Sequence, residues 1–323
     1  MILALHLVEE LCLENLEFIF KGGTAFSVLY NEPFRFSIDV DIITKNNKEE
    51  LEVIFSKILK SSNFNRFEFD LRRNLNNIPK YHYKFFYKSA IDEKESYILL
   101  DVLLEENSYP ELIEKEISNV FILTDGNKVK VKLPTIESIT GDKLTAFAPN
   151  TIGVRYNTSK HIEIIKQLFD VGYLFDSLTH FEIVAISYRR IAEKEIQYRK
   201  LNINIEQALQ DTIETALILG RRSGNKDDNQ LKYNELIKGI GSFQSYTIAN
   251  RFYLDTAIEC AAKGALLAAK ILKNNHDYVS PIEQNIDFKK YLINNIEYNF
   301  LNKLIKIPNN ALYYWYEAIK LLN

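Results

Sequence analysis

The chain has 323 residues, of which 40 are basic and 43 are acidic, so its formal net charge is −3. This balance excludes overall charge as an argument for nucleic-acid binding and leaves only a local basic face. No run of about 18 apolar residues occurs, which excludes a membrane-spanning helix. The two cysteines, Cys12 and Cys260, lie far apart in apolar surroundings. We therefore expect no disulfide scaffold and a cytoplasmic protein.

The N-terminal segment predicts a helix, a strand and a glycine turn in succession. Residues 2–16 have apolar side chains at helical spacing, interrupted by three glutamates. This pattern predicts an amphipathic helix rather than a secretion signal. An apolar run at 18–21 predicts a short strand, and the glycines after it predict a turn into a second helix from Thr24 to Tyr30.

The next predicted strand, 39–43, carries Asp39 and Asp41 at alternate positions among apolar residues. Alternate side chains of a strand lie on one face, with backbones roughly 6.5–7 Å apart. Two carboxylates on one face repel each other and resist burial unless they share a cation. Nucleotidyl transfer uses such carboxylates to hold Mg²⁺ or Mn²⁺, with two ions about 3.5–4 Å apart. The pair therefore predicts a divalent-metal centre that acts on an NTP.

The rest of the first part of the chain also alternates between helix and strand patterns. We predict a helix at 48–61, strands at 64–72, 80–88 and 96–105, and a hairpin of strands 119–123 and 128–132 around Asp125-Gly126-Asn127. These elements predict an α+β fold, in which a mixed sheet with flanking helices forms a first domain, 1–133; the nucleotidyltransferase type of this sheet is implied by a family resemblance described below.

A third acidic side chain interrupts an aliphatic run in the predicted strand 96–105. Asp101 stands between Ile98-Leu99-Leu100 and Val102-Leu103-Leu104. A charge among six aliphatic residues needs a partner. Asp101 either joins Asp39 and Asp41 as a metal ligand, or serves as a base, or forms a salt bridge to a lysine or arginine.

The residues around the glycine turn are candidates for phosphate binding. Gly22 and Gly23 permit close backbone approach, and the start of the following helix offers N–H groups to the β- and γ-phosphates. Thr24 either caps that helix or bonds a phosphate oxygen. Arg35 pairs with the acidic cluster or with the triphosphate. Ser37 either contacts the phosphates, provided the strand extends back to it, or simply begins the strand.

After Pro134 the sequence changes to helical periodicity, which predicts an all-helical bundle over 134–323. Interruptions are expected near 149–157, 177–180, 223–228, 241–245, 274–282 and 308–310. The segment 247–273 is rich in alanine and predicts a buried central helix of this bundle.

Two sequence patterns resemble a known family. The pattern KGGTAF…RFSIDVDI resembles the signature of the AbiEii/AbiGii toxin family of nucleotidyltransferases, within the superfamily of DNA polymerase beta-like folds. The segments ESITGDKLTAFAP (137–149) and KHIEIIKQLFDVGYL (160–174) resemble its later motif. The similarity covers roughly residues 10–180. The part before the glycines is short, and nothing after about residue 180 could be matched.

The resemblance implies the toxin of a two-gene toxin–antitoxin system, which transfers nucleotides, in some cases onto tRNA ends. By position, the metal-binding carboxylates fall on Asp39 and Asp41, the motif lysine on Lys143 and the motif aspartate on Asp170. Lys143 would neutralise triphosphate charge, or it is a solvated lysine paired with Asp142 or Glu137. Asp170 is either buried and bonded to Lys143 or Lys166, or it acts on a hydroxyl nucleophile.

The predicted function is transfer of NMP from an NTP to a hydroxyl acceptor, such as a tRNA end or another RNA, with a cognate antitoxin as a further partner. Two alternatives stay open. One is an NTP-binding regulator without turnover, although three converging acids are more than a binder needs. The other is NMP transfer onto a protein side chain.

Overall fold

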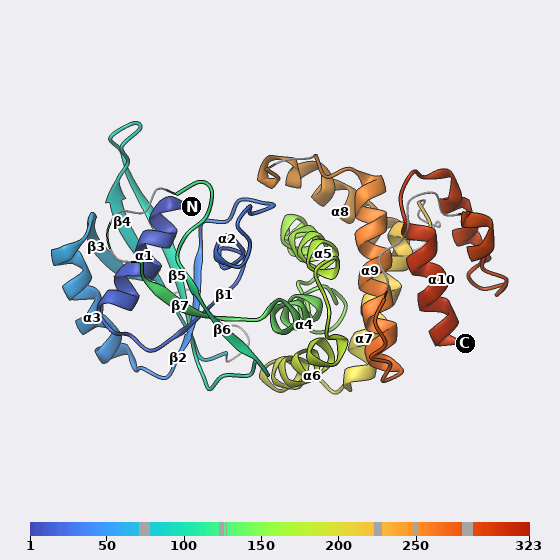
Figure 1. Ribbon diagram of the computed structural model, residues 1–323, viewed down its shortest axis with the longest axis horizontal. Coiled ribbons are helices and arrows are strands. Elements are labelled where there is room, and N and C mark those ends of the chain that lie inside the picture. Colours follow the sequence, from blue (N-terminus) through green and yellow to red (C-terminus); the bar gives the residue numbers. More distant parts are fainter. Residues whose placement is uncertain (71–77, 123–125, 127, 223–227, 249–250, 280–286) are drawn as a thin grey trace. The chain divides into compact units, whose positions relative to one another are not determined.

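Figure 1 shows the computed structural model, which describes residues 1–70, 78–122, 126, 128–222, 228–248, 251–279 and 287–323. The chain divides into two compact units, Met1–Thr135 and Ile136–Asn323. The boundary proposed from the sequence, between residues 133 and 134, lies two residues before this division.

The first unit contains a five-stranded sheet and a separate two-stranded ribbon. Its elements are α1 (Ile2–Leu13), β1 (Ile19–Lys21), α2 (Phe26–Leu29), β2 (Val40–Thr44), α3 (Lys48–Ser61), β3 (Phe64–Phe69), β4 (Lys80–Lys88), β5 (Glu95–Leu104), β6 (Leu112–Glu116) and β7 (Lys130–Pro134). The strand order of the sheet is β1-β2-β5-β4-β3. Because β2 and β5 are parallel and the other neighbours are antiparallel, the predicted mixed sheet is confirmed.

One face of this sheet is apolar and covered by helices α1 and α3. Strand β4 alternates buried Tyr83 and Phe85 with less buried His82 and Lys84. The ring of Phe55, from α3, lies 4.9 Å from the ring of Tyr83 and 5.1 Å from that of Phe85, between centroids. The polar side chains of β4 therefore project from the opposite face, which carries the acidic residues.

Several elements end earlier than their sequence pattern predicts. Helix α1 ends at Leu13 because Asn15 adopts a left-handed backbone conformation (φ 57°), which a short amide side chain tolerates. Helix α2 has only four residues, against the predicted Thr24–Tyr30. Strand β3 ends at Phe69, and residues 71–72 of its predicted range lie outside the described residues. Helix α3 and strand β4 have the predicted bounds.

The predicted strand 119–123 is wrong. The strand that pairs with β7 is β6, upstream of it, with Glu114 opposite Lys132 and Glu116 opposite Lys130. These cross-strand charge pairs support the exposed ribbon. Asn119 begins a turn instead, since its side-chain oxygen accepts a hydrogen bond from the amide of Phe121. Residues 123, 125 and 127 of the predicted hairpin lie outside the described residues.

The second unit is helical. Its elements are α4 (Ile136–Ala146), α5 (His161–Phe175), α6 (Phe181–Tyr198), α7 (Ile205–Gly220), α8 (Asp228–Phe243), the 3₁₀ segment η1 (Gln244–Tyr246), α9 (Leu254–Leu272), the 3₁₀ segments η2 (Phe288–Tyr291) and η3 (Asn299–Lys306), and α10 (Ala311–Leu322). Helix α9 is buried along most of its length, as its alanines predict. It begins seven residues later than predicted, because Gln244 donates to the carbonyl oxygen of Phe252 and holds the preceding chain in a non-helical course.

A buried carboxylate fixes the loop that follows α4. Asp211, on α7, is 4% exposed and accepts hydrogen bonds from the amide of Asn150 at 2.8 Å and the hydroxyl of Thr151 at 2.8 Å. A buried carboxylate with several donors is stable in its charged form. The predicted interruption at 149–157 is thus an ordered connection.

Both cysteines are free thiols, as predicted. Burial raises the pKa of each to about 12, and neighbouring Glu9 adds to the effect at Cys12. Both thiols therefore stay protonated and unreactive at neutral pH. Among the described helices, none combines the length and the apolar character that crossing a membrane requires.

Candidate active site

A row of four polar residues crosses the sheet on the face opposite helices α1 and α3. Lys21 of β1 is paired with Asp41 of β2, Asp41 with Asp101 of β5, and Asp101 with His82 of β4. Residues paired across a ladder project from the same face. The structure therefore brings Asp41 and Asp101 together, as the strand patterns predicted.

Both carboxylate oxygens of Asp101 are engaged by strand β4. His82 Nδ1 lies 2.6 Å from Oδ1, and the ammonium of Lys80 lies 2.6 Å from Oδ2. The Asp101 side chain is only 14% exposed. Burial acts to raise the pKa of Asp101, but the charge of Lys80 and the hydrogen bonds from Lys80 and His82 outweigh it, so the pKa is lowered. Asp101 is an anion at neutral pH.

The salt bridge, one of the roles that the sequence left open for Asp101, is present among the described residues. Lys80 also lies 3.9 Å from Asp41 Oδ1, so its ammonium faces both carboxylates. Within the described ranges, no three aspartate, glutamate, histidine or cysteine side chains gather as a set able to hold a metal ion. Asp39 and Asp41 still fit a divalent ion by donor chemistry, since both supply carboxylate oxygens that are not buried.

The glycine turn lies directly against Asp41. A Cβ atom on Gly22, whose φ is +76°, would stand 2.1 Å from Asp41 Oδ2 and 2.9 Å from Asp41 Cβ. A Cβ atom on Gly23 would stand 2.4 Å from an Nη atom of Arg35. At Gly22 the positive φ and the contact with Asp41 Cβ both require glycine, whereas at Gly23 the atoms met are the end of the Arg35 side chain. The carboxylate of Asp41 thus lies against Gly22, and the guanidinium of Arg35 lies against Gly23.

Thr24 joins this turn to the acidic strand. Its buried hydroxyl donates to the carbonyl oxygen of Asp39 at 2.5 Å. The predicted helix cap is wrong, because α2 begins at Phe26 and Ala25 occupies the N-cap. Strand β2 begins at Val40, just after Asp39, so it does not extend back to Ser37 and Ser37 does not begin it. Thr24 therefore positions the backbone of Asp39.

Arg35 is buried, with 6% of its surface exposed. Its Nη1 donates to the carbonyl oxygen of Phe36 at 3.1 Å, and its guanidinium lies 5.7 Å from the centre of the Phe26 ring. These contacts hold the guanidinium over Gly23, where it adds positive charge to the glycine turn.

The two later motif residues form an ion pair inside the second unit. Lys143 of α4 lies 3.2 Å from Asp170 Oδ2 of α5, and the two side chains are 11% and 0% exposed. Pairing with Lys143 was one predicted role of Asp170, whereas Lys166 pairs with Glu163 at 2.9 Å. The structure thus brings Lys143 and Asp170 together within one unit and the aspartates of the sheet together within the other.

Sequence reasoning did not identify Lys80 and His82 as partners of Asp101. The alternation of polar side chains with buried aromatic ones along β4 was visible in the sequence. It places Lys80 and His82 on one face, but the pairing of His82 with Asp101 depends on the register of β4 and β5.

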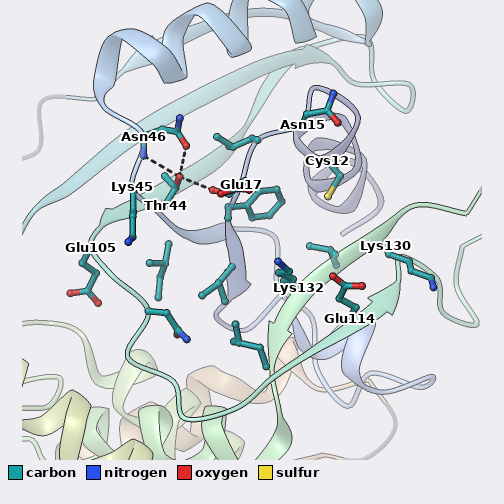
Figure 2. A pocket seen from close by; sticks show the side chains of 17 residues that line it. Cys12, Asn15, Glu17, Thr44, Lys45, Asn46, Glu105, Glu114, Lys130 and Lys132 are labelled. Atoms are coloured by element: carbon teal, nitrogen blue, oxygen red, sulfur yellow. Dashed lines mark hydrogen bonds between the residues drawn. The ribbon is translucent and has the colours of Figure 1, made fainter.

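A cavity of about 540 Å³ lies at the other end of β2 from Asp41 (Figure 2). Its lining includes Thr44 at the end of β2, Lys45 and Asn46 after it, and Lys130 and Lys132 of the ribbon. The Thr44 hydroxyl bonds the carbonyl oxygen of Glu17 at 2.8 Å and the side chain of Asn46 at 2.9 Å. None of the predicted site residues lines this cavity.

A comparison with solved structures found several matching chains. The nucleotidyltransferase toxin MenT4 from Mycobacterium tuberculosis is 10% identical, with a TM-score of 0.51 and coverage of 94% of this chain and 91% of that one. JHP933 from Helicobacter pylori is 16% identical, with a TM-score of 0.43 and coverage of 84% and 91%. An antigenic nucleotidyltransferase-like protein from Paracoccidioides brasiliensis is 15% identical, with a TM-score of 0.39 and coverage of 61% and 87%. At these identities, the likeness to MenT4 shows the fold alone.

No curated protein matches the sequence significantly. A family model described as nucleotidyl transferase AbiEii toxin, type IV TA system, matches residues 7–251. The match continues past residue 180, where the sequence patterns offered no similarity, and it covers most of both units. The chain therefore belongs to the AbiEii family of nucleotidyltransferase toxins.

Proposed function

We propose that this nucleotidyltransferase moves NMP from an NTP to a hydroxyl group of an RNA, such as a tRNA end, in a reaction that depends on Mg²⁺ or Mn²⁺. The observation that carries the proposal is the placement of Asp41, which lies beside Asp101 on one face of the sheet and against the Gly22 backbone. Two aspartates on one face of the sheet, next to a glycine turn, suit a substrate that combines a metal ion with a triphosphate.

In this proposal Asp39 and Asp41 hold the metal ion, which neutralises charge on the triphosphate when it is bound. The acceptor hydroxyl gives up its proton to water as its oxygen attacks the α-phosphorus. The bond from the α-phosphorus to the oxygen that bridges to the β-phosphate breaks, and pyrophosphate leaves. Gly22, Gly23 and Thr24 form the turn that faces the β- and γ-phosphates, and Arg35 adds positive charge there. Ser37, half-buried just before the strand, is a further candidate contact.

The roles of Lys143 and Asp170 follow from the family motif. Lys143 supplies a compact positive charge for the triphosphate, and the buried Asp170 carboxylate, 3.2 Å away, positions it. A side chain with no exposed surface is a poor candidate for direct contact with a hydroxyl nucleophile, so positioning is the role that the geometry favours.

The biological setting that we propose is a two-gene system in the cytoplasm, in which the chain is the toxin and a cognate antitoxin opposes it. Addition of a nucleotide would stop the modified RNA from functioning, and this loss would explain the toxicity.

Incubation with each of the four α-labelled NTPs, Mg²⁺ and total RNA tests the reaction. We expect label in RNA with one or more NTPs, and none when the metal is chelated. A γ-labelled NTP is the matched control, because its label leaves with pyrophosphate. Label that resists ribonuclease but is released by protease would favour transfer to a protein side chain. Tight binding of an NTP, with no product formed from any acceptor, would favour the alternative of an NTP-binding regulator without turnover.

Replacement of Gly22 by alanine tests the contact between the turn and Asp41. The new Cβ atom would overlap Asp41 Oδ2 and Cβ, so the whole side chain must move. We expect transfer to fall by about 10²-fold, the size of effect seen when a positioned electrostatic group is lost. The matched control is Gly126→Ala, since Gly126 also has a positive φ (85°) but nothing within 4 Å of its Cβ position. Both variants carry the backbone cost of roughly 1–2 kcal/mol, and retained transfer in Gly22→Ala would contradict the proposed placement.

A further inference from the structure

The position between Asp41 and Asp101 is filled by a side chain of the protein. Lys80 Nζ lies 2.6 Å from Asp101 Oδ2 and 3.9 Å from Asp41 Oδ1. Magnesium binds carboxylate oxygens at about 2.0–2.1 Å. A cation held by Asp101 Oδ2 would lie close to the ammonium that already contacts this oxygen, and the two positive charges would repel each other.

A second contact fixes the Asp101 carboxylate in the orientation in which it binds Lys80. His82, two residues along the same strand, donates to Asp101 Oδ1 at 2.6 Å. Lys80 and His82 are two residues apart in β4, so both side chains project from the face that carries Asp101. Each oxygen of Asp101 therefore has a donor from β4.

We propose that Lys80 takes the place of a second metal ion, so that the centre binds a single divalent ion on Asp39 and Asp41. Asp101 is then a positioning residue for Lys80 rather than a metal ligand. The inference rests on the proposed function, and it replaces the three-carboxylate centre expected from the sequence. A fixed ammonium supplies positive charge without a requirement for a second ion from solution.

Strand β4 carries a second lysine that is comparable with Lys80. Lys84, the next residue of β4 on this face, is 3.3 Å from Asp70 and so pairs with a different carboxylate. Lys80 and Lys84 are similarly exposed, at 29% and 28%. Lys84 is therefore a matched control for Lys80 in charge, strand, face and exposure.

Bound ions can be counted without measuring turnover by titrating the protein with Mn²⁺ and recording the loss of the paramagnetic resonance signal of the free ion. We expect one ion in the wild-type protein and in Lys84→Met. Lys80→Met should bind two ions, because the vacated position offers oxygens of Asp101 and Asp41. Lys80→Met combined with Asp101→Asn should return to one ion, and Asp101→Asn alone should keep one. Thermal melting of each variant checks that it is folded.

Two ions in the wild type, reduced to one by Asp101→Asn, would show that Asp101 is a ligand and overturn the inference. One ion in Lys80→Met would overturn it as well. A different failure belongs to the proposed function: if Asp39→Asn/Asp41→Asn still binds the wild-type ion, the centre itself lies elsewhere.

Discussion

The double variant Asp39→Asn/Asp41→Asn should lose transfer by about 10³-fold or more, since it removes both negative charges, and one oxygen of each carboxylate, that are proposed to hold the metal ion. Asparagine keeps the size and shape of both side chains. The hydrogen bond that Thr24 donates to residue 39 uses a backbone carbonyl and is therefore preserved. The substitution thus changes charge at the centre and little else.

The stability of the same variant separates a functional role from a structural one. Asp39 is exposed and Asp41 is half-exposed. Neither side chain is buried, and the contact of Asp41 with Lys80 is long at 3.9 Å, so neutralisation of both aspartates should change the melting temperature little. The control is Asp70→Asn, which removes a carboxylate paired with Lys84 on the same sheet. Label transfer to RNA and growth arrest on expression should both survive in Asp70→Asn and disappear in the double variant.

The shared face of Asp41 and Asp101 could be predicted because strand alternation and the cost of a charge among aliphatic residues constrain it locally. The partners of Asp101 could not. Whether β4 presents His82 or a buried tyrosine opposite Asp101 depends on the register with β5, and a shift of one residue would reverse the faces. That register is set by the connection between Lys88 and Glu95 and by packing of the aromatic face.

Two errors in the fold prediction share a physical cause. At Asn119 a side-chain amide bonded to the backbone turns the chain where the residue pattern favoured a strand. At Gln244 a side chain holds the carbonyl oxygen of Phe252 and delays the start of α9. Such bonds join particular side chains to backbone groups, and periodicity does not encode them. Long patterns, as in α3 and β4, were predicted with the observed bounds.

The ion pair in the helical unit leads to the largest expected change in stability. Asp170 has no exposed surface and lies 3.2 Å from Lys143, which is 11% exposed. Replacing Asp170 with alanine leaves a buried ammonium without this carboxylate, which costs about 3–5 kcal/mol of unfolding free energy. Urea denaturation measures this loss. Lys166→Ala is the control, since it removes a lysine of the same helix that pairs with the half-exposed Glu163, and such pairs contribute less than about 1 kcal/mol.

The double variant Lys143→Met/Asp170→Leu then decides what the pair is for. Removing both charges restores much of the stability lost on removing one, because no buried charge is left unpaired. If the pair only holds α4 to α5, this variant should transfer NMP at close to the wild-type rate. If Lys143 neutralises the triphosphate, as the family motif implies, the variant should be folded and about 10²-fold slower. We expect the second result, because a pair retained only for stability can be replaced by apolar side chains, whereas a positive charge used on a phosphate cannot.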